Sequence, residues 1–291
     1  MTGLASRALI ASYLELNIFR QMTSEQTKEL YVVGYCHPES NSDLDMEGIR
    51  PGVLHNVNLA YKICAEINRV SRVTSLYMDG FDETGAAVAI DYLRQAVEAC
   101  EGENPSDVLK MGLREANMRN DIDVFNTIFS TLLMNALSPG GSGLTLEPTD
   151  YDFDHFRKVV SFQLLRYWCI ANSKNRESLS SDDRAEYIKF ELKFRDDKMY
   201  KSILDTASGV NMLLVGLAHP LDNLMADPRF SSFRVDINNL DHDGRILVSG
   251  KLPQKLSTIS ECIDGTRKES GLEPFLFLPH DVGIDTQIEF V

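Results

Sequence analysis

Short apolar segments alternate with long amphipathic segments along this chain, and that alternation constrains its fold more than any other feature. Residues 31–34, 72–78 and 210–216 are short, apolar and rich in β-branched or aromatic side chains, which is typical of buried strands. Residues 53–70 and 84–100 repeat apolar side chains every three or four positions, which is typical of amphipathic helices. Strands that alternate with helices of this length predict an α/β fold with a mainly parallel central sheet flanked by helices. We expect further strands at residues 233–237, 245–249, 275–278 and 288–291, and further helices at residues 4–21, 106–137, 153–170 and 181–207.

The length and composition indicate one domain. A chain of 291 residues, 43% of them hydrophobic, can bury a large core, about three quarters of its unfolded surface. We therefore expect a single α/β domain over residues 1–291, with a helical insertion over approximately residues 151–207. The second helix of that insertion, residues 181–207, is heavily charged, so we expect it to present a solvated face.

The charge balance excludes two classes of partner. With 29 Lys and Arg against 43 Asp and Glu, the formal net charge is −14, and such a chain repels nucleic-acid phosphates and anionic lipid. No stretch approaches the ~20 apolar residues that cross a bilayer, and the N-terminus shows no secretory signal peptide. The five cysteines form no CxxC pair, which is typical of a reducing compartment. We expect neither nucleic acid nor a membrane as a partner.

Two of the predicted strands end in the same pattern, Gly-x-x-His. Residues 34–37 read Gly-Tyr-Cys-His, and residues 216–219 read Gly-Leu-Ala-His. In parallel sheets ligands bind beyond the carboxyl ends of the strands, so His37 and His219 are expected at a common crevice. Glycine permits a sharp turn or a close approach to a ligand, and a neutral imidazole can act as a general base or a metal ligand. A third match, residues 52–55, opens a helix, so we interpret it as accidental.

Acidic and basic residues accompany the two histidines. Asp79 directly follows the strand predicted at residues 72–78, and Asp82 stands three positions later. Arg114 falls early in a predicted helix, beside its buried stripe, where a guanidinium can stabilise an oxyanion or hold a carboxylate in place. Two histidines, an acid and an arginine therefore make up the predicted site.

These landmarks resemble the superfamily that joins the erythromycin esterases, the ChaN-like haem-uptake proteins and the TraB/Tiki group of metal-dependent proteases. Its members share a parallel α/β core, two Gly-x-x-His motifs at strand ends, an acid after the second strand and an Arg-acid-x-x-Met segment that opens a helix. This chain has Asp79 and Arg114-Glu-Ala-Asn-Met118 in the matching order between its two motifs. The resemblance is confined to these segments. Toxins and type III effectors of bacterial pathogens carry domains similar to this fold.

The resemblance implies an esterase-like or metal-dependent peptidase-like hydrolase, and its toxin members imply a virulence effector. His37 would be the general base that activates water, and Asp79 would position that water or the imidazole. Arg114 and His219 would stabilise the oxyanion. We expect no required cofactor; in a metal-dependent version His37, His219 and Asp79 would be the ligands. The substrate would be a small molecule or a peptide, met in the bacterial cytoplasm or, after secretion, in the host cytoplasm.

Two departures from the family pattern keep other functions open. The esterase and ChaN branches usually carry Glu after the first glycine, where this chain has Tyr35, and the acid after the second strand is usually Glu, where it has Asp79. Tyr35 and Asp82 are expected to bind substrate, although the phenol could instead close the site. One alternative is an effector without catalysis, which binds a host protein or a ligand and uses the charged helix at residues 181–207. A second alternative, by analogy with ChaN, is a haem-binding protein in which Tyr35 or His37 ligates the iron.

Overall fold

A computed structural model gives the fold. Its strands, in chain order, are β1 (Lys28–Tyr35), β2 (Leu44–Asp45), β3 (Gly48–Ile49), β4 (Ser75–Met78), β5 (Thr145–Glu147), β6 (Val210–Gly216), β7 (Phe230–Asn239), β8 (Ile246–Leu252) and β9 (Ile284–Phe290). Its helices are α2 (Pro51–Ser71), α3 (Glu83–Ala99), α5 (Ile122–Leu137), α8 (Ser181–Thr206), α9 (Asp222–Met225), the 3-10 helix η3 (Gln254–Leu256) and α10 (Thr258–Asp264). The structure describes residues 27–36, 44–45, 48–49, 51–81, 83–99, 118–119, 122–137, 145–149, 181–239, 245–264 and 283–291.

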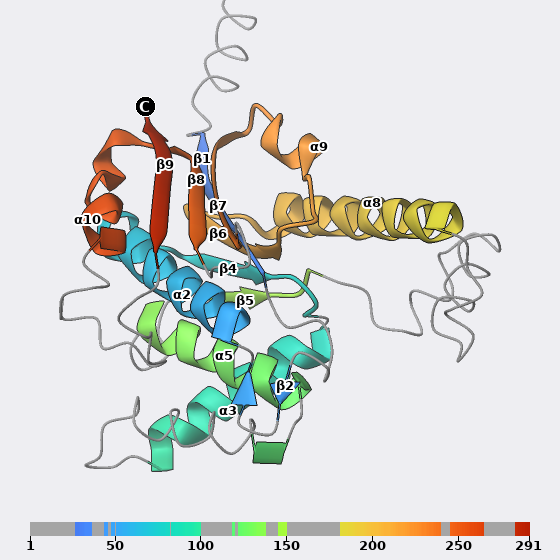
Figure 1. Ribbon diagram of the computed structural model, residues 1–291. Coiled ribbons are helices and arrows are strands. Elements are labelled where there is room, and N and C mark those ends of the chain that lie inside the picture. The colour runs from blue at the N-terminus through green and yellow to red at the C-terminus, as the bar shows by residue number, and fades with distance from the viewer. Residues whose placement is uncertain are drawn as a thin grey trace, which may run out of the picture.

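Seven of the described strands form one sheet, in the order β5-β4-β6-β1-β7-β8-β9 (Figure 1). The first five strands of this order are parallel to one another, whereas β8 and β9 run antiparallel to them. Parallel strands of one sheet need a long crossover between them, and α2 lies in the crossover from β1 to β4, two positions away in the sheet. Among the described strands, β2 and β3 form a separate two-stranded pair. The predicted α/β fold, with a mainly parallel sheet flanked by helices, is confirmed.

An apolar core lies on each face of the sheet. On one face, Tyr31 and Val33 of β1 are buried together with residues of α2, α3, α5 and α10. On the other face, Leu30 and Val32 of the same strand are buried together with residues of α8 and α9. Successive residues of a strand point to opposite faces, so β1 supplies both cores. This is why its apolar residues form a continuous run in the sequence instead of alternating with polar ones.

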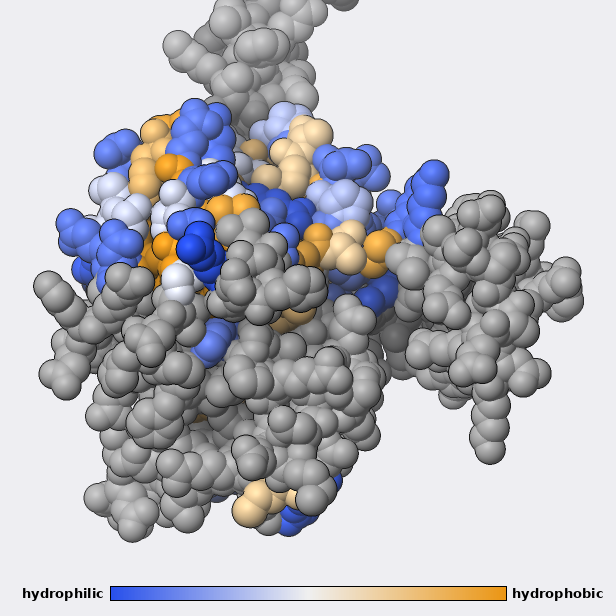
Figure 2. All heavy atoms as spheres, in the orientation of Figure 1, coloured by the Kyte–Doolittle hydropathy of each residue, from blue (hydrophilic) through white to orange (hydrophobic). Residues whose placement is uncertain are grey.

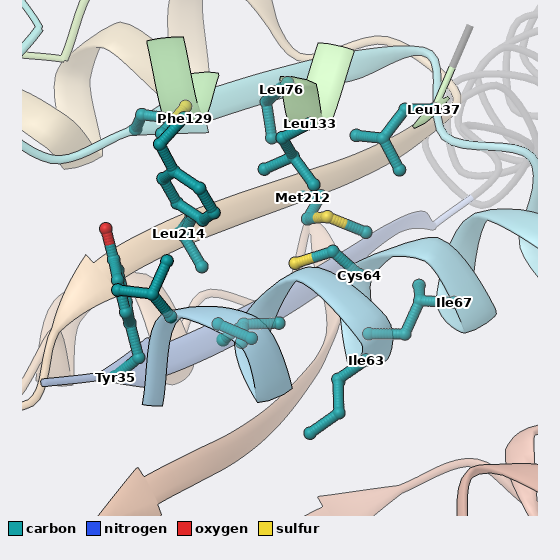
Figure 3. Close-up of a cluster of buried hydrophobic side chains, with 14 of the residues drawn as sticks. Tyr35, Ile63, Cys64, Ile67, Leu76, Phe129, Leu133, Leu137, Met212 and Leu214 are labelled. Atoms are coloured by element: carbon teal, nitrogen blue, oxygen red, sulfur yellow. The ribbon is translucent and has the colours of Figure 1, made fainter. Parts of the chain in front are cut away.

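The larger core lies between the sheet, α2 and α5 (Figure 3). Ile63, Cys64 and Ile67 of α2 are fully buried, and each isoleucine contributes about 1.5–3 kcal/mol by leaving water. Burial raises the pKa of the Cys64 thiol, so this cysteine stays neutral and acts as a small apolar core residue.

The helix α8 exposes charged residues, such as Lys193, Asp197 and Lys201, and it also buries a second face on the sheet that its charge did not suggest. Met199 and Ile203, one turn apart in its C-terminal half, are fully buried in the core of that sheet face. Many charged residues precede and follow these two apolar side chains in the sequence. The hydropathy pattern of the helix therefore reflects mainly its exposed face. The C-terminal half of α8 therefore packs on the sheet, so its residues lie close to the strands (Figure 1).

The strand β4 begins three residues later than predicted, because α2 ends in a tight cap. The carbonyl of Asn68 accepts from the N–H of Arg72 at 2.8 Å, and its side-chain Oδ1 accepts from the N–H of Val73 at 2.9 Å. Arg72 has a left-handed φ of 53°, which a strand residue does not adopt. The cap thus uses residues that we expected in the strand.

Several predicted elements lie outside the described residues. These are the helices at residues 4–21 and 153–170, the strand at residues 275–278 and most of residues 106–121. The helix α5 ends at Leu137, where the sequence predicts its end.

The described surface mixes hydrophilic and apolar residues. On the face shown in Figure 2, the apolar residues lie in small groups separated by hydrophilic ones. Large apolar side chains are exposed at a few described positions only, Val88, Ile90, Met118 and Val291. Among the helices that the structure describes, none has the length and apolar content needed to span a bilayer.

Candidate functional site

The carboxyl ends of β1 and β6 form the topological switch point of the sheet. The two strands are parallel neighbours, paired from Glu29 and Val210 to Tyr35 and Gly216. The helix that follows β1, α2, packs on one face of the sheet, whereas α9, which follows β6, packs on the other. Open α/β sheets bind ligands where neighbouring strands send their connections to opposite faces. Residues at these two strand ends are therefore the first candidates for a site.

His219 is carried to this position by a tight turn after β6. Its backbone N–H donates to the carbonyl of Gly216 at 3.2 Å. The N–H of Leu217 donates to the carbonyl of Tyr35 at 3.3 Å, which ties the turn to the end of β1. The imidazole side chain is 3% exposed, so it is enclosed by protein rather than presented to solvent.

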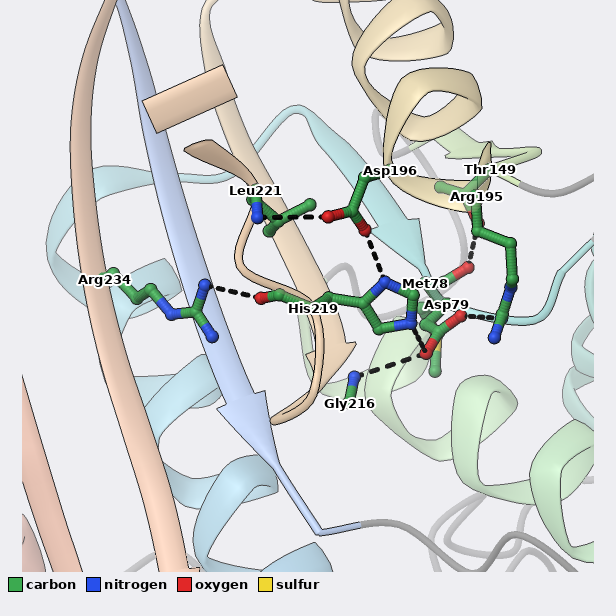
Figure 4. A network of polar contacts seen from close by, with 9 residues as sticks. All are labelled: Met78, Asp79, Thr149, Arg195, Asp196, Gly216, His219, Leu221 and Arg234. Atoms are coloured by element: carbon green, nitrogen blue, oxygen red, sulfur yellow. Dashed lines mark hydrogen bonds and ion pairs between the residues drawn. The ribbon is translucent and has the colours of Figure 1, made fainter. Parts of the chain in front are cut away.

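Gly34, the glycine of the first Gly-x-x-His motif, also contributes to holding the turn after β6. Arg234 of β7 donates from Nη1 to the carbonyl of His219 at 2.8 Å (Figure 4). Its Nε donates to Asp236 Oδ1 at 2.9 Å. A Cβ on Gly34 would lie 2.0 Å from that Asp236 oxygen. Gly34 therefore makes room for the Asp236–Arg234 pair, which holds the second motif's turn, so the close approach that a glycine permits is made here to a side chain.

The structure brings Asp79 and His219 together. The N–H of Asp79 donates to the carbonyl of Leu214 at 2.9 Å, which extends the pairing of β4 with β6 by one residue. The Asp79 carboxylate is 5% exposed, and its Oδ2 lies 3.3 Å from Nε2 of His219. The same oxygen accepts from the N–H of Gly216 at 3.3 Å (Figure 4). Two residues far apart in the sequence thus meet at the carboxyl ends of neighbouring strands.

Two charged residues of α8 complete this arrangement. Arg195 donates from Nη2 to Oδ1 of Asp79, and Nδ1 of His219 lies 2.5 Å from Oδ1 of Asp196. The second oxygen of Asp196 accepts from the N–H of Leu221 at 3.2 Å, a residue with a left-handed φ of 57°. We call the four side chains of Asp79, Arg195, Asp196 and His219 the edge cluster.

Sequence reasoning missed Arg195 and Asp196. They stand in a helix where most positions are polar, so no local pattern separates two site residues from the solvated ones around them. The sequence offers one signal, the apolar pair Met199 and Ile203. The structure buries this pair, which marks the face of α8 that packs on the sheet. Arg195 lies four positions before Met199, and residues four apart share a helix face.

The edge cluster holds the imidazole of His219 in its protonated form. Burial lowers the pKa of His219, but the hydrogen bonds to Asp196 and Asp79 outweigh burial and raise the pKa from 6.5 to about 9. At neutral pH the cluster then consists of two carboxylates and two cations, which balance. Because both ring nitrogens of the imidazolium donate, the ring has no lone pair for a proton. At neutral pH His219 is thus a positive charge with no free ring nitrogen to act as a general base.

We expect the free energy of unfolding to fall between about pH 6.5 and pH 9. Folding raises the pKa of His219, so the folded state holds this proton more tightly than the unfolded chain. The stabilisation is complete below about pH 6.5 and is lost as the pH rises through about 9, by up to about 1.4 kcal/mol per pH unit. Denaturant titrations at about pH 6, 7.5 and 9 measure this loss. A His219→Gln variant with the same pH dependence as the unchanged protein would contradict it.

Tyr35 lies in the core and not in the edge cluster. Its side chain is 7% exposed, and its ring centroid lies 6.0 Å from that of Phe129 on α5 (Figure 3). Burial, with a further contribution from the Asp79 carboxylate, raises the pKa of the Tyr35 phenol well above its ordinary value of 10. A neutral, enclosed phenol gives no support to substrate binding by Tyr35 or to phenolate ligation of haem iron.

The other predicted site residues are not placed. His37, Asp82 and Arg114 lie outside the residues that the structure describes. Of the Arg-acid-x-x-Met segment the structure describes Met118, whose side chain is 78% exposed. The roles expected for these residues therefore stay predictions.

The four side chains of the edge cluster do not fit a metal ion. No group of three or more His, Cys, Asp or Glu side chains among the described residues is arranged to hold one. Asp79 already accepts from the guanidinium of Arg195, and His219 carries its own positive charge, so a cation here would face two others. We derive no step through a metal from these residues.

Comparisons of the chain with protein-family models, with curated proteins and with solved structures give no match. The likeness to the erythromycin esterase, ChaN and TraB/Tiki superfamily therefore rests on the two Gly-x-x-His motifs, on Asp79 and on the Arg114-Glu-Ala-Asn-Met118 segment.

Proposed function

We propose that this chain is a hydrolase-like protein of the erythromycin esterase, ChaN and TraB/Tiki superfamily that acts as a bacterial virulence effector. The observation that carries the proposal is the contact between Asp79 and His219 at the switch point of the sheet. Buried groups with strongly shifted pKa values gather at functional sites, and His219 is such a group in the position where this fold binds ligands.

Arg195 is the member of the edge cluster that a substrate can reach. Its side chain is 23% exposed, compared with 5% for Asp79 and 3% for His219. A guanidinium carries five N–H donors, so one held by Asp79 can still donate to a negative oxygen outside the cluster. In this proposal Arg195 stabilises the oxyanion, which is the role that we assigned to Arg114 from the sequence.

The remaining three side chains of the cluster position Arg195 and set the local potential. The Asp79 carboxylate holds the guanidinium, and the imidazolium of His219 keeps Asp79 from being an unbalanced buried charge. His37, directly beyond β1, is proposed as the general base that takes a proton from the attacking water.

A panel of ester and peptide substrates tests the proposal. We expect the purified full-length chain to hydrolyse a member of the panel, and His37→Ala and Arg195→Gln each to lower kcat/KM by about 10²-fold or more. Lys193→Gln changes an exposed charge two positions from Arg195 and should leave the rate unchanged. Each protein is assayed with EDTA and with added zinc or manganese, and circular dichroism checks folding. Rates that are the same in all four proteins would overturn catalysis at this site.

A second candidate, an effector that binds without catalysis, is favoured by the closed form of the cluster. Both nitrogens of His219 already face carboxylates, and both oxygens of Asp79 have partners. For this candidate the cellular phenotype would survive His37→Ala and Arg195→Gln. Charge reversal at exposed positions of α8, such as Lys193→Glu and Asp197→Lys, would remove it.

A further inference from the structure

A second group of buried polar side chains lies on α2, on the opposite face of the sheet from α8. His55, Asn58 and Lys62 follow one another at intervals of three and four residues, so they share one stripe of the helix. Their exposed fractions are 6%, 0% and 7%. His55 ends the third Gly-x-x-His match, which the sequence led us to interpret as accidental. We call these three residues the α2 stripe.

Three polar atoms of the α2 stripe lack partners. Nε2 of His55 and both amide atoms of Asn58 are buried without a hydrogen bond. Lys62 lies within electrostatic reach of the Cys262 thiol on α10, and no described carboxylate forms an ion pair with it. Buried polar groups in native proteins are almost always hydrogen bonded, so three unpartnered atoms beside a lysine on one stripe indicate a group that binds there.

The next buried polar residue on this side of α2 has hydrogen-bond partners. Glu66, four positions after Lys62, is also buried, but Oε2 accepts from Nε of Arg69 at 2.7 Å and Oε1 accepts from Thr258 of α10 at 2.6 Å. Hydrogen-bond partners are thus present at Glu66, toward the C-terminal end of α2, and are missing at His55 and Asn58, toward its N-terminal end.

The chemistry of the stripe indicates the kind of ligand. Among His55, Asn58 and Lys62 the charged group is the ammonium of Lys62, and the Glu66 carboxylate beyond it is already paired with Arg69, so the stripe favours an anion. Burial lowers the pKa of Lys62, and burial also lowers the pKa of His55, so His55 is neutral and can accept or donate one hydrogen bond. Asn58 offers a donor and an acceptor at once. A complementary anion therefore also carries a hydroxyl group, because the Asn58 oxygen needs a donor.

We propose that His55, Asn58 and Lys62 form a binding site for a small oxyanion that carries a hydroxyl group, with inorganic phosphate as its simplest form. Phosphate near neutral pH keeps at least one proton for the Asn58 oxygen. Sulfate has the same shape and comparable charge but no proton, so it would leave that oxygen without a donor. The site is separate from the edge cluster, and the proposal does not depend on hydrolysis.

Calorimetry and thermal unfolding of the full-length chain test this site with phosphate and sulfate at equal ionic strength. We expect saturable phosphate binding at least about tenfold tighter than sulfate binding, and a rise of several degrees in Tm at saturating phosphate. Asn58→Leu and Lys62→Met should each weaken phosphate binding at least about tenfold. In phosphate-free buffer Asn58→Leu should not lower Tm, because it removes two buried atoms that have no partner.

Asn68→Leu is the matched control on the same helix. Asn68 donates from Nδ2 to the carbonyl of Leu137 at 2.8 Å and accepts from the N–H of Val73 at 2.9 Å, so its loss should lower Tm. Its phosphate response should stay that of the unchanged protein. Equal shifts with phosphate and sulfate, or an undiminished phosphate response in both Asn58→Leu and Lys62→Met, would overturn the proposal.

Discussion

Replacing His219 with glutamine is expected to lower the free energy of unfolding by about 3 to 5 kcal/mol at pH 7, because it removes the cation between two buried carboxylates. The side chains of Asp79 and Asp196 are 5% and 13% exposed, so water cannot replace the imidazolium. A glutamine amide is neutral and can donate to one carboxylate at most in this geometry. Arg195 still neutralises Asp79, so the larger cost falls on Asp196. Denaturant unfolding measures the change.

A double-mutant cycle tests that reason. Asp196→Asn should cost less in the His219→Gln background than in the unchanged protein, because the unpaired charge has already been created there. We expect an interaction free energy of about 1 kcal/mol or more. Asp197→Asn, at the neighbouring exposed position of α8, should change stability by no more than about 0.5 kcal/mol. Additive effects, or a His219→Gln loss below about 1 kcal/mol, would contradict a buried ionic network.

Substituting alanine for Gly250 is expected to cost about 4 kcal/mol or more, the range in which single substitutions abolish folding. Gly250 lies in the middle of β8, opposite Val235 of β7, with a φ of +150°. A Cβ there would lie 2.2 Å from the carbonyl oxygen of Arg234 and 2.8 Å from the Cα of Val235. Both neighbours are backbone atoms, so no side-chain rotation relieves the clash. The yield of folded protein and denaturant unfolding report the effect.

Gly80→Ala separates the clash from the backbone strain. Gly80 also has a positive φ, +81°, but a Cβ at this position would meet nothing within 4 Å. It should therefore cost only the strain of a left-handed alanine, about 1 to 2 kcal/mol. If Gly250→Ala were no more harmful than Gly80→Ala, the close pairing of β7 with β8 at this point would be wrong. That pairing also matters to the site, because Arg234 of β7 holds the turn that carries His219.

The edge cluster gives α8 two roles at once. Met199 and Ile203 attach the helix to the sheet by burial, and Arg195 and Asp196 attach it by ionic hydrogen bonds to strand-end residues. Loss of the ionic contacts would therefore loosen the helix as well as change the site. For this reason the activity of Arg195→Gln is compared together with its circular dichroism, and His219 is tested through stability.

Much of the fold could be predicted from the sequence, because strands and helices leave local patterns. The strand β6 matches its predicted range, residues 210–216, and β1 extends the predicted residues 31–34 at both ends. The start of β4 was predicted three residues too early, because the Asn68 cap uses those residues. The exposed face of α8 could be predicted from its charge, but the face that Met199 and Ile203 bury on the sheet could not.

Local patterns were enough to predict which segments become strands and that Asp79 and His219 stand at their carboxyl ends, because apolar periodicity and glycine act over a few residues. The partners of that pair depend on the packing of distant segments. Whether Arg195 and Asp196 are surface charges or members of the site depends on how α8 packs against the sheet, and ionic contacts across such packing leave no local pattern. The protonation of His219 follows from that packing too, since two carboxylates from different elements must enclose one buried ring to raise its pKa.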